Sequence, residues 1–225
     1  MNSGPLLFLG LFVTMACSWL GFVLGPQLQL GGMTQTNTVV VGTNLSDTYP
    51  IALPGDSRQG AEVYRANGCA ACHTEMVRPL SQGSDIRHAW GARRSVAEDY
   101  LFDQPVMLGS QRVGPDLANF GRRSDLNGIL LRLYDPRLIT PGSVMPPCRY
   151  LFETRKIGIF PSREALVLPA PDAPPPGCET VARPEALALA AYLLSLRQGS
   201  YLFDAPPPPQ KTNAVLTATN KSASK

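Results

Sequence analysis

The most constraining feature of this sequence is a five-residue cluster, Cys69-Ala70-Ala71-Cys72-His73. Two cysteines three positions apart, followed at once by a histidine, form the attachment signature of c-type haem. Thiols with this spacing at the end of a helix can reach the two vinyl groups on one edge of a porphyrin, and the histidine then falls beneath the iron as its proximal ligand. The motif therefore predicts one covalent haem c, attached at Cys69 and Cys72 and ligated by His73.

Two other uses of a cysteine pair fit the sequence less well. A structural zinc site needs a second pair of ligands, and the only other histidine is His88. A thioredoxin-like redox pair needs a βαβ setting, and no such pattern surrounds the motif. A zinc or thiol–disulfide module remains the alternative should covalent haem be absent.

The second axial ligand decides what such a haem does, because a methionine thioether raises the reduction potential and suits electron transfer. Met76 is only three residues past His73 and cannot reach the opposite face. Met145 is flanked by Pro146 and Pro147, which stiffen the backbone, so Met145 is the favoured ligand. Met107 is the second candidate, and either methionine can instead be a core side chain that fills a gap. His88 is a weaker candidate.

The sequence Gly114-Pro115-Asp116-Leu117 offers a partner for the other nitrogen of the His73 ring. A histidine that ligates a metal usually donates this N–H to a fixed acceptor, and the carbonyl of Pro115 in a rigid turn is suitable. Side chains that are candidates to contact the haem propionates are those of Arg78, Arg112, Trp90 and Tyr100. Solvated charges and core aromatics are equally good interpretations of these four.

The N-terminal segment carries no charged side chain before Asp47. Within it, the apolar run from Leu6 to Leu24 spans roughly 28 Å as a helix, close to the thickness of the hydrocarbon core of a bilayer. A cleaved signal peptide usually begins with basic residues, which are absent here, and the residues before Cys17 match a lipoprotein signal poorly. We expect an uncleaved anchor in residues 1–30, which the positive-inside rule cannot orient.

The rest of the chain divides by composition. Residues 31–55 are rich in Gly, Gln, Thr and Asn and predict an extended tether, and residues 205–225 predict a disordered Pro-rich tail. The folded domain is then residues 56–204. A net charge of +3 is too small and too evenly spread to indicate a nucleic-acid partner.

Within this domain the regular patterns are helical. Helices are expected at 58–67, at 125–133 with Ile129, Leu130 and Leu133 on one face, and at 184–197 with Leu187, Ala190, Ala191 and Leu194 on one face. No strand pattern rivals them. The predicted fold class is therefore all-α, a few helices joined by long loops, which need the haem to complete the core.

These features resemble known proteins at two levels, a broad fold class and a narrower family. Gly60 and Tyr64 before the motif, and Ala191-Tyr192-Leu193 near the end, resemble the crossing of the first and last helices in class I cytochromes c. The runs GAEVYRANGCAACHTEMVRPL, GSQRVGPDLANFGRR, YDPR and SVMPP resemble the membrane-anchored mono-haem subunit (subunit II) of cbb3-type cytochrome c oxidases. The extension Thr74-x-Met76-x-Arg78-Pro79 is the most specific part.

The resemblance implies a relay of electrons through one haem c, ligated by His73 and Met145, to a catalytic haem b/copper subunit that reduces O2. It also implies contact with membrane lipid and with the catalytic subunit, with or without a further cytochrome c subunit. The protein is then single-pass in the bacterial inner membrane, with its haem domain in the periplasm. The resemblance thus implies that the chain has no catalytic activity by itself and serves as an electron-transfer subunit. The rival hypotheses are a free-standing anchored carrier and the small subunit of a nitric oxide reductase.

The sequence departs from the family between residues 150 and 179, a segment longer than expected, with cysteines at Cys148 and Cys178. Two lone thiols in an oxidising compartment favour pairing. We therefore hypothesise a Cys148–Cys178 disulfide that holds this segment near the haem edge, with two unpaired thiols as the alternative.

Overall fold

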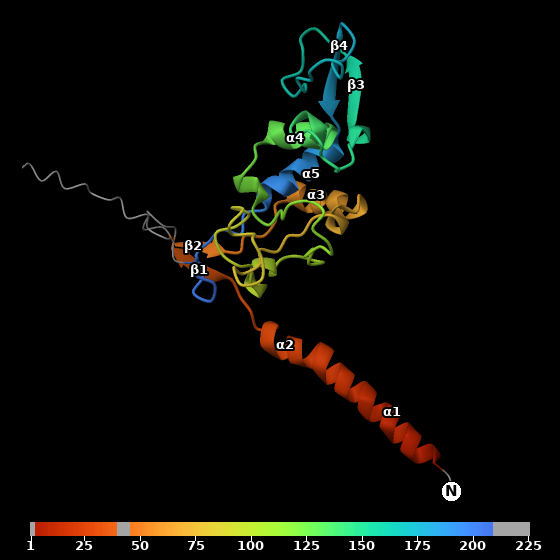
Figure 1. Ribbon diagram of the computed structural model, residues 1–225, viewed down its shortest axis with the longest axis vertical. Helices are drawn as coiled ribbons and strands as arrows, with labels where there is room; N and C mark the ends of the chain where they lie inside the picture. The colour runs from red at the N-terminus through yellow and green to blue at the C-terminus, as the bar shows by residue number, and fades with distance from the viewer. Residues whose placement is uncertain (1–2, 40–45, 209–225) are drawn as a thin grey trace, which may run out of the picture.

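A computed structural model describes residues 3–39 and 46–208 of the chain (Figure 1). A long N-terminal helix leads into a domain of short helices, loops and two small sheets. The β3–β4 sheet lies at the end of the molecule opposite the N-terminal helix (Figure 1). The 17 C-terminal residues of the expected tail, 209–225, lie outside the described residues.

The N-terminal helix consists of α1 (Gly4–Trp19), a π-helical turn (Leu20–Leu24) and α2 (Gly25–Leu30). The π turn closes with a bond from the amide of Gly25 to the carbonyl of Leu20, just before Pro26, which has no N–H to donate. The whole stretch from residue 4 to residue 30 is long and apolar enough to cross a membrane, and none of its most apolar window is buried against the domain. At 1.5 Å per residue it is about 40 Å long.

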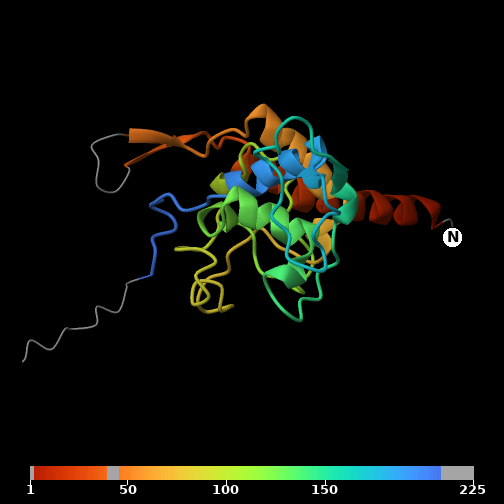
Figure 2. The ribbon, with the colours of Figure 1, turned by 90° about the horizontal axis from the view of Figure 1, so that it is seen from above.

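Residues expected to form an extended tether instead form a β-hairpin. Strand β1 (Thr36–Val39) pairs antiparallel with β2 (Ser46–Tyr49), with Thr36 opposite Tyr49. Seen from above, this hairpin projects from one side of the domain (Figure 2). Only residues 31–35 separate the N-terminal helix from the hairpin.

The three expected helices are present with shifted ends. They are α3 (Gly55–Ala66), α4 (Leu126–Tyr134) and α5 (Pro184–Ser195). The Asp125 side chain caps α4 by accepting from the amide of Gly128 at 3.2 Å. Short 3₁₀ turns connect the loops at Cys69–Ala71, Ala97–Tyr100, Phe120–Arg122, Pro136–Leu138 and Arg149–Leu151.

The prediction of an all-α fold is wrong in one respect, because the described residues include strands. Besides the hairpin β1–β2, strand β3 (Phe152–Lys156) pairs antiparallel with β4 (Cys178–Ala182). This second ribbon lies in the segment that is longer than the family resemblance led us to expect. Only one residue of β3 is buried, so its sequence carries no clear alternation of apolar and polar residues.

The centre of the domain is the crossing of α3 and α5. A Cβ placed on Gly60 would lie 1.9 Å from the carbonyl oxygen of Ala188 and 2.7 Å from Cβ of Tyr192, so the two backbones approach as closely as glycine allows. The rings of Tyr64 and Tyr192 meet beside this contact, with centroids 5.4 Å apart.

The close approach decides which face of α5 is buried. Helix α4 buries its three expected residues, but α5 does not bury the stripe we expected. Its buried residues are Ala186, Ala188, Leu189, Ala190, Tyr192 and Leu193, so only Ala190 is common to both sets. Both a small residue, Ala188, and a large one, Tyr192, lie against α3, a pattern that helical periodicity alone does not predict.

Replacing Gly60 tests this crossing. We expect Gly60→Ala to lower the free energy of unfolding by about 1–3 kcal/mol, because the added methyl group overlaps backbone atoms of α5 that cannot rotate away. The measurement is urea denaturation followed by circular dichroism. Gly55→Ala in the same helix is the control, since a Cβ there meets nothing within 4 Å and its effect is expected to stay within about 0.5 kcal/mol. Equal effects of the two changes would contradict the assigned contact.

Candidate haem site

The cysteine motif begins directly after α3. Gly68 has φ +67°, a left-handed conformation that ends the helix and directs the chain into the 3₁₀ turn that carries Cys69. Cys69 is partly buried and Cys72 is exposed, and both thiols are free. Burial, followed by the nearby Cys148 thiol, raises the pKa of Cys69 to about 11. Both cysteines are therefore available for attachment to a cofactor edge.

The ring of His73 is oriented by the turn at Gly114 and Pro115. Its Nδ1 lies 2.8 Å from the carbonyl oxygen of Pro115, a distance suited to an N–H donated by the ring. A Cβ on Gly114 would lie 2.3 Å from Cε1 of the same ring, so only glycine leaves room for it. Within the described residues Nε2 has no hydrogen-bond partner, which leaves it free to bind a metal.

The loop that follows residue 107 wraps along the motif through four backbone hydrogen bonds. The amides of Ser110, Gly114 and Leu117 donate to the motif segment, and the amide of Glu75 donates to Leu108 at 3.1 Å. Gly109 has φ +80°, and a Cβ there would lie 2.1 Å from the carbonyl oxygen of His73. Met107 thus precedes a loop bound to the backbone of the His73 segment.

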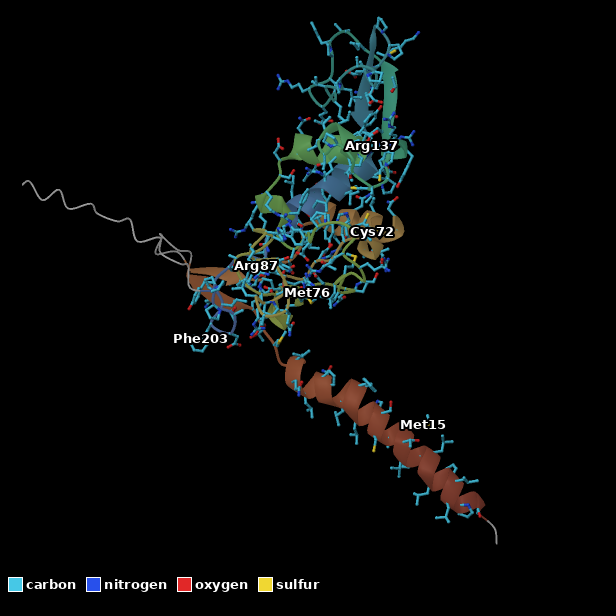
Figure 3. All side chains as sticks on the ribbon, in the orientation of Figure 1. Met15, Cys72, Met76, Arg87, Arg137 and Phe203 are labelled. Carbon is cyan, nitrogen blue, oxygen red and sulfur yellow. The ribbon has the colours of Figure 1, made fainter. Side chains whose placement is uncertain are left out.

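The Met145 loop has different attachments. It follows α4 and a 3₁₀ turn, and the amide of Cys148 donates to the carbonyl of Leu133 in α4 at 2.8 Å. The side chains of Met145 and Met107 are both partly buried and pack against the apolar core. In Figure 3, Arg137, from the turn after α4, lies on one side of Cys72, and Met76 lies on the side nearer the N-terminal helix.

Arg78, a sequence candidate for a propionate contact, is bound to a buried carboxylate within the protein. Its backbone amide, Nε and Nη2 donate to the Asp85 carboxylate at 2.7, 3.2 and 2.9 Å. Nη1 of Arg112 lies 2.7 Å from the same carboxylate, whose side chain is fully buried. Burial tends to raise the pKa of Asp85, but these guanidiniums outweigh it and hold the pKa below its usual value.

The two aromatic candidates for the propionates also have partners within the protein. The hydroxyl of Tyr100 donates to the carbonyl of Glu75 at 2.6 Å, and the ring of Trp90 stacks on His88 with centroids 5.1 Å apart. These contacts stabilise the loops around the motif without requiring a ligand.

Among the buried acidic residues that the sequence analysis missed, Asp85 and Asp116 bind the segment after His73. Asp116 accepts from Thr74 Oγ1 at 2.7 Å and from the amide of Met76 at 2.8 Å, which fixes the segment after His73. It lies in the Gly-Pro-Asp-Leu turn that the analysis singled out for Pro115 alone. Asp85 lies in an irregular loop, and nothing in the local sequence distinguishes it from an exposed acid.

The Cys148–Cys178 disulfide hypothesis is wrong, because both thiols are free in the structure. Cys178 pairs with Lys156 at one end of the β3–β4 ribbon, whereas Cys148 precedes β3 at the other end. Four residue steps along a strand separate these ends by about 13 Å, and a disulfide needs Cα atoms within about 7 Å.

The described residues also contain no group of three or more His, Cys, Asp or Glu side chains placed to hold a metal ion. The zinc alternative therefore has no ligand set within that part of the chain. A thioether-linked haem needs only the two thiols, the His73 ring and one further ligand.

Comparison with known proteins gives one family. The model described as "Cytochrome C oxidase, mono-heme subunit/FixO" matches residues 45–160, just over half of the chain. A search of curated proteins gives no match.

Removing the charge of Asp85 tests the buried cluster. We expect Asp85→Asn to lower the free energy of unfolding by about 2–3 kcal/mol at pH 7, because a neutral amide then takes the place of the carboxylate that accepts hydrogen bonds from the two guanidiniums. The depressed pKa of Asp85 stabilises the fold above the ordinary aspartate pKa of about 3.9, and this contribution is lost as the pH falls below that value. The difference between variant and parent is therefore expected to shrink below about pH 4 in urea denaturation series.

Glu62→Gln is the matched control. Glu62 pairs with Arg65 on α3, and both side chains are more than half exposed, so the change is expected to cost less than about 0.5 kcal/mol. A difference between Asp85→Asn and its parent that stays constant from pH 7 to pH 3 would show that the carboxylate charge is not what stabilises the cluster.

Proposed function

Because the chain belongs to the FixO family of mono-haem cytochrome c oxidase subunits, we propose that it is the electron-relay subunit of a membrane-bound cbb3-type oxidase. It accepts one electron at a time from a donor and passes it to a catalytic subunit that reduces O2. The observation that carries this proposal is the oriented His73 ring directly after two free cysteines, inside the matched region.

The residues of the motif fit a covalently attached haem. Cys69 and Cys72 would hold its edge through thioethers, and Nε2 of His73 would ligate the iron while Pro115 fixes the ring from behind. A haem bound there supplies one-electron chemistry at its iron. Gly114 keeps the space beside the imidazole free, so that the ring can hold one orientation.

We propose Met145 as the second axial ligand. Met107 enters a loop whose backbone is bonded to the His73 segment itself, which favours a position on the same side as the proximal ligand. Met145 instead comes from a separate loop held by α4, so it can approach from the opposite side. The flanking Pro146 and Pro147 limit the motion of its sulfur.

The short link to the N-terminal helix favours a fixed subunit over a free shuttle. We propose that this helix is a single-pass anchor in the inner membrane and that the haem domain lies in the periplasm. The five residues between α2 and β1 span at most about 17 Å, much less than the reach of an extended 25-residue tether. A carrier that travels between complexes needs the longer reach.

The ligand assignment predicts a spectroscopic difference between two matched variants. Met145→Ala is expected to abolish the sulfur–iron charge-transfer band of the oxidised protein and to lower its midpoint potential, because a thioether stabilises reduced iron. Met107→Ala, which changes the same residue type in the other loop, is expected to keep the band. Loss of the band in Met107→Ala and its persistence in Met145→Ala would reverse the assignment.

Haem composition tests the function itself. We expect a pyridine haemochrome spectrum of the tagged chain, purified in mild detergent, to show one covalent haem c per chain together with co-purifying haem b. Oxygen uptake by the same sample then identifies O2 as the electron acceptor, whereas consumption of nitric oxide would favour the reductase. Haem c without haem b, after chemical cross-linking in the membrane before extraction, would favour the anchored carrier.

A further inference from the structure

A buried arginine joins the two segments that enter and leave the domain on the side of the anchor. Arg93 is only 2% exposed, and its guanidinium donates to both oxygens of Asp99, at 2.7 and 3.0 Å. The Asp99 side chain is fully buried. Nε of Arg93 donates to the carbonyl of Ser200, in the segment after α5, at 2.7 Å. Arg93 thus holds the chain that leaves the domain.

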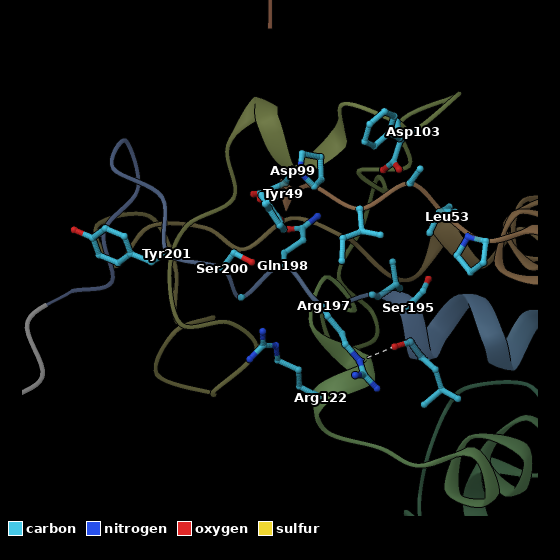
Figure 4. A pocket seen from close by; sticks show the side chains of 18 residues that line it. Tyr49, Leu53, Asp99, Asp103, Arg122, Ser195, Arg197, Gln198, Ser200 and Tyr201 are labelled. Carbon is cyan, nitrogen blue, oxygen red and sulfur yellow. Dashed lines mark hydrogen bonds between the residues drawn. The ribbon is translucent and has the colours of Figure 1, made fainter. Parts of the chain in front are cut away.

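The same pair holds the chain that arrives from the anchor. The hydroxyl of Tyr49, the last residue of β2, donates to Asp99 at 2.5 Å, and the guanidinium of Arg93 lies 5.8 Å from the centre of the Tyr49 ring. Burial and the neighbouring Asp99 raise the pKa of Tyr49, so its hydroxyl stays protonated and donates. Figure 4 shows Tyr49 and Asp99 together on the wall of a hollow of about 650 Å³, with Ser200 nearby. We call Tyr49, Arg93, Asp99 and the Ser200 carbonyl the anchor clasp.

The anchor clasp is connected to the haem site by a short path. Ser95, two residues after Arg93, exchanges two hydrogen bonds with the backbone of Val77, both of 2.9 Å. Val77 lies four residues after His73 and is buried. A path of backbone and hydrogen bonds therefore runs from the His73 segment through Val77 and Ser95 to the clasp.

The clasp determines how far the domain can move from the membrane. With the clasp closed, only residues 31–35 separate the anchor from the hairpin, at most about 17 Å. If β2 is released, residues 31–54 become the tether, with a root-mean-square length of about 27 Å and a fully extended length of about 80 Å.

Stability alone does not explain a buried arginine at this position. Desolvating an ion pair costs as much as the pair gains, and apolar side chains of similar size often pack as well. Arg93 differs from an apolar residue in that its planar fork contacts three separate segments in fixed geometry, at Asp99, Ser200 and the ring of Tyr49.

We propose that Arg93 is a positioning residue that, through Asp99 and Tyr49, locks the link from the anchor onto the haem domain and holds the haem site at a short, fixed reach from the membrane. This proposal rests on the relay function above, because a relay to one fixed partner needs a constant separation between donor and acceptor sites, whereas a shuttle does not.

The test is a distance measurement between two spin labels on the full chain with bound haem in lipid nanodiscs. One label is attached to Cys17 in the anchor and the other to a cysteine introduced by Glu62→Cys on α3; Cys148 and Cys178 are replaced by serine. The haem is kept reduced so that the low-spin iron is diamagnetic, and the distances are read by pulsed dipolar spectroscopy.

We expect one narrow distance distribution in this parent. Arg93→Ala is expected to broaden it and to add distances about 10 Å or more beyond the parent's, because the root-mean-square length of the released tether is about 27 Å against at most about 17 Å in the parent. Arg93→Lys restores the charge without the fork and is expected to give an intermediate width. Arg87→Ala, at an exposed arginine earlier in the same loop, is the control and is expected to match the parent.

Tyr49→Phe keeps the test informative if Arg93→Ala fails to retain haem. It removes only the hydroxyl bond to Asp99, keeps the ring under Arg93, and is expected to add a minor long-distance component while the haem absorption spectrum stays unchanged. A parent distribution already as broad as that of the variants, or variants with intact haem that are as narrow as the parent, would overturn the proposal. These distances need no partner subunit, so they fail or hold independently of the haem b measurement that tests the relay function.

Discussion

The approach of α3 to α5 at Gly60 is the contact on which the rest of the domain depends. It brings Tyr192 against Tyr64 and directs the Tyr192 hydroxyl to the carboxyl group of Glu75, at 2.7 and 2.9 Å. Burial raises the pKa of Glu75 to about 8. Since Glu75 lies two residues after His73, the helix crossing directly fixes the segment that carries the proposed haem ligand.

In this domain buried acidic side chains bind the backbone of the loops, whereas in many other domains regular secondary structure satisfies the backbone. Asp85, Asp99, Asp116 and Asp135 are each almost fully buried, and each accepts hydrogen bonds from backbone amides, arginines or both. Asp135 accepts from Arg137 and Arg149 and so holds the base of the loop that carries Met145. Hydrogen bonds to these carboxylates satisfy backbone amides of the long loops. The positions of the loops therefore depend on a few buried carboxylates as well as on the apolar core.

Local sequence patterns were reliable where the structure itself is local. The N-terminal apolar helix and helices α3, α4 and α5 follow from apolar runs, a capping residue and helical spacing, and the ends of α3, α4 and α5 are shifted by at most three residues. The two hairpins were missed because Thr36 and Asn37 of β1 are polar and exposed and β3 buries only one residue, so the pairing depends on the opposite strand and not on a pattern within each strand. The Cys148–Cys178 disulfide was wrong for the same reason, since the β3–β4 ribbon separates its two ends.

The sequence alone determined the chemistry that the chain can support. The spacing of Cys69, Cys72 and His73 is fixed by the sequence itself. The Gly114-Pro115 turn supplies a carbonyl acceptor, and the proline ring restricts the backbone that carries it. The tertiary structure alone decided how these groups are held. It placed the carbonyl of Pro115 against the His73 ring, bound Arg78 to Asp85, and joined Arg93 to the carbonyl of Ser200 beyond α5. These contacts join residues that are far apart in the chain or lie in irregular loops, and their energies come from burial and charge pairing that exist only after the chain has folded.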